Sequence, residues 1–215
     1  MNQKMKIEIE TFLKKYKLVK YKKGQILVRP DDNFGKIILE KTGFTRVYKT
    51  TEDEREISWP ILKPMWLYSL ITAIGDKKNE YYVETVTKME AWVVPVDEFL
   101  NFLETKKIDK EEIYKSVISE LVELSEKIEQ LVLADAYTKV AILINELTIN
   151  FGKKEGSETI IDFNIPHRVM ASITGLTRET VTLQILKMQK DKILYNKGRS
   201  MVIKDIKRLK LTGQI

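Results

Sequence analysis

The sequence predicts an α+β fold in which a β-rich unit comes first, a long helix follows, and a second, mainly helical unit completes the chain. Three observations support this order. Short β-type runs separated by turn residues occupy residues 18–100. From Asp109 onward the apolar residues take the spacing of a helix. Basic residues then concentrate near the C-terminus, around a glycine that separates two helical segments.

Composition limits the chemistry that the chain can carry. Its 215 residues are 43% apolar, which is enough for one large domain or two modest domains, each with its own core. Cysteine is absent, which excludes disulfides, iron–sulfur clusters and thiolate zinc sites, and His167 is the only histidine. We therefore expect no catalytic residues, no metal and no cofactor. No apolar run is long enough to span a membrane and no signal peptide is evident, so we expect a soluble, cytoplasmic protein.

The net positive charge of the chain lies entirely in its last third. Residues 1–134 carry 23 basic and 23 acidic residues, whereas residues 135–215 carry 14 and 8. Between Pro166 and Lys210 there are 11 basic and 3 acidic residues, a net charge of +8. Such a surface is typical of an anion-binding module, although a solvated lysine-rich face is the alternative interpretation.

The β-rich unit is predicted to hold about eight strands in a sandwich or small barrel. Residues 33–35 and 41–43 are the expected turns. A short amphipathic helix over residues 5–16 precedes the strands and is expected to pack on the outside of this unit.

The long helix that follows has apolar residues at alternating spacings of three and four, which is a heptad seam. The seam consists of Tyr114, Val117, Leu121, Leu124, Ile128 and Leu131. Asp109 and Glu112 could form a capping box at its start. The seam favours self-association, and the alternative is that the helix lies against its own β-rich unit.

The second unit is predicted to begin with a helix over residues 137–151 that is apolar on most sides and therefore central to a core. Residues 152–158, "GKKEGSE", are expected to form a loop, and residues 159–165 a short strand. Pro166 then opens a helix that ends near Thr174.

A helix-turn-helix is predicted where that helix ends. Gly175 can take a positive φ in the turn, and Thr177 is a natural N-cap for a second helix. In this second helix Val181, Ile185 and Met188 are expected to face inward. The segment "KILYNKGRSMVIKD" is typical of a β-hairpin with its turn at residues 196–198, and a hairpin after a helix-turn-helix makes a winged helix.

The stretch "GLTRETVTLQILKMQKDKIL" and the hairpin after it resemble the DNA-binding end of the cyclic-AMP receptor protein/FNR superfamily of bacterial transcription regulators. The resemblance extends over nearly the whole chain, through "YKKGQIL" and "VVPVDEFLNFL". It implies an N-terminal β-roll, a cupin-like jelly roll, over residues 1–108. It further implies a dimerisation helix over residues 109–134 and a winged-helix DNA-binding domain over residues 135–215.

By this resemblance, Arg178 and Glu179 read base edges, since arginine pairs well with guanine and glutamate with cytosine. Leu183 stands where the cyclic-AMP receptor protein carries a second base-reading arginine, so the DNA site is expected to differ there. His167 at the first helix is a possible phosphate contact. The full set of expected DNA-binding residues is Arg168, Thr177, Arg178, Glu179, Thr182, Leu183, Lys187, Lys197 and Arg199.

The ligand side departs from members of the superfamily that bind cyclic nucleotides. Met65–Tyr68 stands in place of the glycine-acid part of the phosphate cassette, and the expected arginine is missing, so we expect no response to cyclic AMP. In this respect the chain resembles the PrfA-type regulators. Aromatic residues in the β-rich unit could line a pocket for another small molecule or a peptide, or could be core: Trp59, Trp66, Tyr68, Tyr81 and Tyr82.

The sequence thus predicts a homodimeric, sequence-specific regulator that binds an inverted repeat in double-stranded DNA and works with RNA polymerase. Two other classes of protein compete with this prediction. A metal-dependent enzyme on a cupin-like barrel lacks the histidines it would need. A protein-interaction adaptor with decayed DNA binding is the alternative, and the retained Arg178–Glu179 pair and the +8 segment argue against it.

Overall fold

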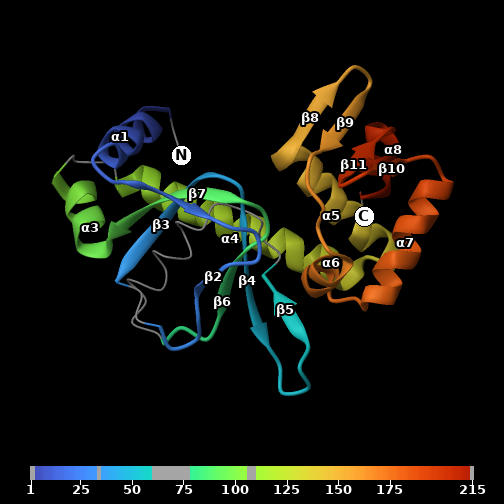
Figure 1. Cartoon of the computed structure of the whole chain (residues 1–215), viewed down its shortest axis with the longest axis horizontal. Helices are drawn as coiled ribbons and strands as arrows, with labels where there is room; N and C mark the ends of the chain where they lie inside the picture. The colour runs from blue at the N-terminus through green and yellow to red at the C-terminus, as the bar shows by residue number, and fades with distance from the viewer. Residues whose placement is uncertain (1–2, 33–34, 60–77, 106–109, 214–215) are drawn as a thin grey trace. The chain divides into compact units, whose positions relative to one another are not determined.

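The structure is a computed structural model that describes residues 3–32, 35–59, 78–105 and 110–213 (Figure 1). The chain divides into two compact units. The first contains residues 1–49 and 63–124, and the second contains residues 50–62 and 125–215. The predicted α+β class is confirmed: a jelly-roll-like β domain is followed by helices and a helix-turn-helix. The predicted domain boundaries at 108/109 and 134/135 stay a prediction.

Seven described strands build the β-rich region, compared with the eight that the sequence predicted. They are β1 Leu18–Tyr21, β2 Ile26–Val28, β3 Lys36–Thr42, β4 Thr45–Thr50, β5 Glu56–Ser58, β6 Tyr82–Thr85 and β7 Met89–Pro95. One sheet has the order β1-β7-β3 and the other the order β2-β6-β4-β5. The turn between β3 and β4 contains Gly43 at φ +80°, where a side chain would collide with the Lys88 carbonyl oxygen. A turn is present there, but β3 extends through Thr42, so the turn predicted over residues 41–43 begins at Gly43. Most of the other predicted turn, residues 33–35, lies outside the described residues.

Helix α1 (Gln3–Leu13) packs against the first sheet together with α3 (Val96–Thr105). One face of α1 is buried there, as the amphipathic pattern predicted. The shared core is formed by Ile9, Leu13, Ile37, Leu39, Val94, Phe99 and Phe102. The rings of Phe12 and Phe102 stack 4.1 Å apart and join the two helices directly.

A buried ion pair joins β4 and β6, and no pattern in the sequence predicted it. Arg46 Nε and Nη2 donate to Glu84 Oε2 at 3.0 and 2.6 Å, and the guanidinium lies 4.0 Å from the Tyr48 ring. The two residues are cross-strand partners in the register of β4 and β6, which places their side chains on the same face. Pairing across strands therefore allows an arginine to be buried in this sheet.

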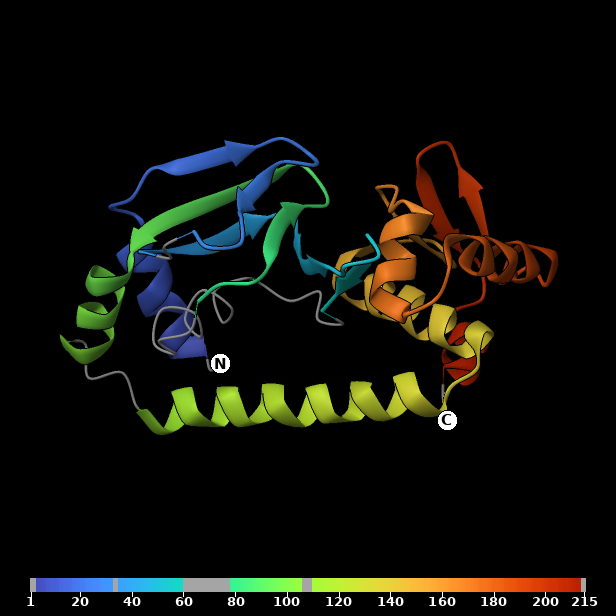
Figure 2. The same cartoon turned by 90° about the horizontal axis from the view of Figure 1, so that it is seen from below.

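Helix α4 (Lys110–Leu133) is a single helix of 24 residues, which Figure 2 shows as unbroken. The helix predicted from the apolar spacing that begins at Asp109 is therefore confirmed. The predicted capping box stays a prediction, because Asp109 and the side chain of Glu112 lie outside the described residues. Within the described part of the chain, no helix is both long and apolar enough to cross a membrane.

The second unit is built on α5 (Ala136–Phe151), whose buried side chains include Val140, Ile144 and Leu147. Its other elements are β8 Gly152–Glu155, β9 Glu158–Ile161, α6 His167–Thr174, α7 Arg178–Lys190, β10 Leu194–Lys197, β11 Ser200–Ile203 and α8 Ile206–Thr212. Helices α6, α7 and α8 all contact α5, which confirms the central place predicted for this helix (Figure 1).

The prediction of a loop over residues 152–158 is wrong. Residues 152–155 form β8, which pairs with β9 at one edge of the sheet β10-β11-β9-β8 (Figure 1). The run is charged and mostly exposed, so it lacks the apolar alternation that signals a strand. Only its backbone pairs with β9, and an edge strand tolerates such a composition.

Candidate nucleic-acid interface

The turn between α6 and α7 has the geometry of a helix-turn-helix. Gly175 ends α6 in the left-handed conformation, at φ +67° and ψ +22°, and its N–H donates to the Ala171 carbonyl oxygen. Thr177 is the N-cap of α7, and its hydroxyl accepts a hydrogen bond from the Thr180 N–H at 3.1 Å. Both residues have the conformations predicted for them, and three residues therefore suffice to join the two helices.

Helix α7 has one buried face and one exposed face. Val181, Ile185 and Met188 are buried, as predicted. The opposite face exposes Arg178, Glu179, Leu183, Leu186, Lys187 and Lys190. This face has charged groups at its start and two exposed leucines in its middle. It suits contact with the edges of base pairs, because charged side chains can hydrogen-bond to bases and a leucine can contact a thymine methyl group.

Thr182, one of the expected DNA contacts, already uses its hydroxyl within the protein. Its Oγ1 donates to the Arg178 carbonyl oxygen at 2.9 Å and lies 2.7 Å from His167 Nδ1. His167 is half-buried at the start of α6. The sequence placed both residues near DNA but gave no sign that they contact each other.

Arg168 is also engaged inside the second unit. Its Nη1 lies 2.8 Å from Glu56 Oε1 of β5, which belongs to the same unit. The Arg168 side chain is 64% exposed and that of Glu56 only 17%. The arginine is therefore accessible, but its charge is partly compensated by a carboxylate 112 positions earlier in the chain.

Lys187 lies over the ring of Tyr137, with Nζ 4.5 Å from the ring centre. The Tyr137 hydroxyl donates to Asp191 Oδ2 at 3.2 Å, and Arg208 Nη1 donates to the Asp191 carbonyl oxygen at 2.9 Å. Burial raises the pKa of Tyr137, and its hydrogen bond to Asp191 adds to this effect. These contacts hold the C-terminal end of α7 against α5 and α8. No local pattern in the sequence indicates them.

The wing is the antiparallel hairpin of β10 and β11, in which Lys197 pairs with Ser200. Lys197 and Arg199 are exposed at its tip, as predicted. The turn begins two residues later than predicted, because Asn196 and Lys197 belong to β10 and Gly198 takes the positive φ of +62°. The wing is joined to β9 through Met201, Val202 and Ile203.

The heptad residues of α4 divide into exposed and half-buried positions. Tyr114, Leu121 and Ile128, which are seven residues apart, are 61%, 60% and 53% exposed. Val117 and Leu124 are half-buried, and the side chain of Leu131 lies outside the described residues. A row of exposed apolar side chains at heptad spacing is the pattern that a second helix would cover.

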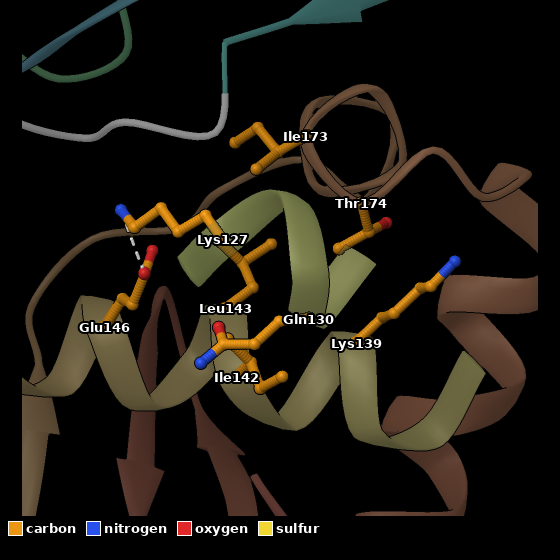
Figure 3. Close-up of a pocket in the computed structure, with 8 residues that line it drawn as sticks. All are labelled: Lys127, Gln130, Lys139, Ile142, Leu143, Glu146, Ile173 and Thr174. Atoms are coloured by element: carbon orange, nitrogen blue, oxygen red, sulfur yellow. Dashed lines mark ion pairs between the residues drawn. The ribbon is translucent and has the colours of Figure 1, made fainter. Parts of the chain in front are cut away.

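The junction between α4 and α5 is fixed by side chains within the second unit. Figure 3 shows Lys127 of α4 and Glu146 of α5 pointing toward one another, and Nζ and Oε1 are 3.0 Å apart. They border a small cavity of about 30 Å³ that also involves Gln130, Lys139, Ile142, Leu143, Ile173 and Thr174. Asp135 caps α5 by accepting from the Thr138 N–H at 2.8 Å, which lowers the pKa of its carboxyl group. The cavity beside Lys127 and Glu146 has room for water but not for a larger ligand, so it is a packing feature.

A larger cavity of about 490 Å³ lies in the β domain. The described residues that line it are Tyr21, Leu27, Val28, Asp32, Gly35, Lys36, Ile38 and Val93. Tyr81 and Tyr82, two of the predicted pocket aromatics, are not among them: Tyr82 stacks on Tyr48 at 5.2 Å, and Lys49 lies over Tyr81 at 5.8 Å. Trp59 is half-buried in the segment that groups with the second unit. Trp66 and Tyr68 lie outside the described residues.

Metal chemistry has no support in the part of the chain that the structure describes. No group of three or more histidine, aspartate or glutamate side chains there is arranged to hold an ion.

Comparison with protein families matches both units. Residues 18–106 match the cyclic nucleotide-binding domain, and residues 138–212 match the Crp-like helix-turn-helix domain. The chain belongs to the CRP/FNR family. This DNA-binding transcription regulator of the CRP/FNR type is accordingly not an enzyme, as predicted. The match over residues 18–106 neither confirms the likeness to PrfA-type regulators nor tests the missing cassette.

Two curated relatives cover most of this CRP/FNR regulator. The global nitrogen regulator of Synechococcus elongatus is 19% identical over 180 residues, which are 81% of this chain and 79% of the relative. The CRP-like cAMP-activated global transcriptional regulator of Mycobacterium tuberculosis is 18% identical over 201 residues, 94% of this chain and 90% of the relative.

Solved structures share the fold of this regulator. FixK2 from Bradyrhizobium japonicum has a TM-score of 0.74 at 16% identity, with 93% of this chain and 98% of FixK2 covered. A CRP/FNR family transcriptional regulator from Thermus thermophilus has a TM-score of 0.68 at 18% identity, covering 92% of this chain and 98% of that one. At such identities the likeness concerns the fold.

Proposed function

We propose that this regulator acts as a homodimer, reads an inverted repeat in double-stranded DNA with α7, and does so without cyclic AMP. The observation that carries the proposal is the exposed face of α7, which begins with Arg178 and Glu179 directly after the Thr177 cap. The cap fixes the helix start, so the two charged side chains leave the first turn in a defined direction.

Six exposed residues of the interface have a proposed role. Arg178 reads guanine and Glu179 reads cytosine, because these pairings match donors with acceptors in the major groove. Leu183 contacts a thymine methyl. Lys187 and the wing residues Lys197 and Arg199 contact phosphates, which positions the protein without specifying sequence.

Dimerisation through α4 supplies a second α7 helix, which binds the second half-site of the DNA. The exposed row of Tyr114, Leu121 and Ile128 supports a two-helix seam. A two-fold dimer would present its two α7 helices to successive major grooves about 34 Å apart, which requires an inverted repeat. Contact with RNA polymerase from the DNA-bound dimer is part of this proposal.

Independence of cyclic AMP is supported by the residues in the cassette region, where Met65–Tyr68 supplies no counter-charge for a phosphate. The cavity of about 490 Å³ in the β domain supports a different effector, a small molecule or a peptide. Its lining combines apolar side chains with Asp32 and Lys36, which would orient a polar ligand.

Selection of binding sites from random DNA tests the proposal. Arg178→Ala is expected to lose on the order of 1–3 kcal/mol per half-site and to relax the preference at one symmetric base pair. Lys197→Ala and Arg199→Ala serve as matched controls: they should weaken all sequences alike and reduce the log–log salt slope by about 1 for each phosphate group that the variant no longer binds. An unchanged sequence preference in Arg178→Ala would favour the protein-interaction adaptor instead.

A further inference from the structure

We propose that His167 is a positioning residue for the recognition helix α7, and that its protonation makes DNA binding by this regulator depend on pH. The inference rests on the proposed function of α7. It concerns a contact between the first residue of α6 and the first turns of α7, 15 positions apart in the chain.

The hydrogen bonds of Thr182 decide which imidazole nitrogen carries the proton. The Arg178 carbonyl oxygen can only accept, so the single hydroxyl proton of Thr182 is donated to it at 2.9 Å. The same hydroxyl oxygen lies 2.7 Å from His167 Nδ1 and must therefore accept from it. Neutral His167 is thus the Nδ1–H tautomer, and its Nε2 is the nitrogen that takes up a proton.

This arrangement ties α6 to the part of α7 that reads DNA. His167 holds Thr182, and Thr182 holds the carbonyl group of Arg178, the residue proposed to read guanine. A displacement of the imidazole would therefore move the first turn of α7 relative to α6. Because base readout depends on the placement of α7, the effect should fall on sequence preference more than on general affinity for DNA.

The surroundings of His167 are positively charged. Arg178 faces it from α7, and Arg199 of the wing lines a cavity of about 70 Å³ that His167 also borders. Arg168 follows His167 in α6, and Glu56 compensates part of the charge of this arginine. The other described residues around this cavity are uncharged, among them Leu147 of α5, Ile161 of β9, Asn164, Asn196 and Ser200. Asp162, next to Ile161, accepts a hydrogen bond from Ser200 at 3.0 Å. Burial lowers the pKa of His167, and the charge of Arg178 lowers it further.

Bound DNA would change the balance between the neutral and the protonated form of His167. Phosphate groups bring negative charge to a surface that carries three arginines near the imidazole, which favours the protonated form. The pKa of His167 is then higher in the complex than in the free protein. Binding takes up a proton, so affinity must rise as the pH falls from the pKa of the complex to the lower pKa of the free protein.

The chain contains a single histidine, so its NMR signals can be assigned without ambiguity. We expect nitrogen chemical shifts of the Nδ1–H tautomer in the free wild-type protein, and a titration midpoint below that of an ordinary histidine. Addition of an operator duplex should raise this midpoint. The Nε2–H tautomer, or a midpoint that DNA leaves unchanged, would overturn the inference.

Binding measurements at constant ionic strength between pH 5.5 and 8 provide the second test. His167→Asn keeps an N–H near the position of Nδ1 but does not titrate, so it should bind the operator like wild type at pH 8 and lose the gain at low pH. At pH 8, where His167 is neutral, His167→Leu and Thr182→Val remove the contact and should each weaken operator binding about 5-fold, with random DNA little affected. Thr182→Ser keeps the hydroxyl and is the matched control.

The double variant His167→Leu with Thr182→Val should bind about as well as either single variant, because both changes remove the same contact. Additive losses, or a pH dependence that persists in His167→Asn, would contradict the inference while leaving DNA recognition by α7 intact. If wild-type protein showed no preference for any sequence at any pH, the proposed function itself would fail and the inference with it.

Discussion

Arg168 at the start of α6 forms an ion pair with Glu56, with Nη1 and Oε1 2.8 Å apart. To contact a phosphate, the guanidinium must leave this carboxylate. Glu56→Gln should therefore tighten DNA binding, by about 2- to 5-fold because an ion pair whose arginine is exposed contributes little, and should steepen the log–log salt slope by up to about 1.

The control for this prediction is a double-variant cycle measured by fluorescence anisotropy. Arg168→Gln alone should weaken binding, and adding Glu56→Gln to it should have no further effect. A gain from Glu56→Gln that persists without the arginine would mean that the carboxylate acts through general charge instead of through Arg168.

The seam of α4 predicts the oligomeric state. Leu121→Asp with Leu124→Asp would place unpaired charges between two helices, so the protein should become a monomer of 25.1 kDa and bind DNA weakly. Val122→Asp is the matched control, because Val122 is also exposed but follows the seam residue Leu121 and lies outside the heptad pattern. Light scattering reports the mass, and a double variant that remained dimeric would refute the assignment of this helix.

Replacing Gly175 is expected to destabilise the protein for a purely conformational reason. Its φ of +67° is unfavourable for other residues, while an added Cβ would have no atom within 4 Å. Gly175→Ala should thus lower the free energy of unfolding by about 1–2 kcal/mol, measured by urea denaturation. Gly175→Asn should cost less, because asparagine tolerates the left-handed region, and equal losses in both variants would point to a steric cause.

The cassette region predicts the response to cyclic AMP. Calorimetric titration of the full-length protein should give no binding heat at sub-millimolar ligand, because Met65–Tyr68 offers no counter-charge to the phosphate. Saturable binding with the stoichiometry of one site per chain would show that another part of the β domain supplies this charge.

Local chemistry made much of the DNA-binding unit predictable. A glycine that can take positive φ, a threonine cap and apolar residues at 181, 185 and 188 define a turn and a helix face within 14 residues. These signals act between neighbours in the chain, so they can be recognised without knowing what else packs nearby. The heptad spacing of α4 is local in the same sense.

Other features could not be predicted because they depend on segments distant in the chain. Strand β8 is a strand because β9 pairs with its backbone, and its own composition is that of a loop. Arg46 is buried because Glu84 lies opposite it across two strands. The amino-acid sequence alone determined the fold class, the helix-turn-helix and the division of α7 into a buried and an exposed face. Only the tertiary structure decided that Arg168 is paired with Glu56 and that His167 holds Thr182, since both contacts arise when separate elements are brought together by packing of the second unit.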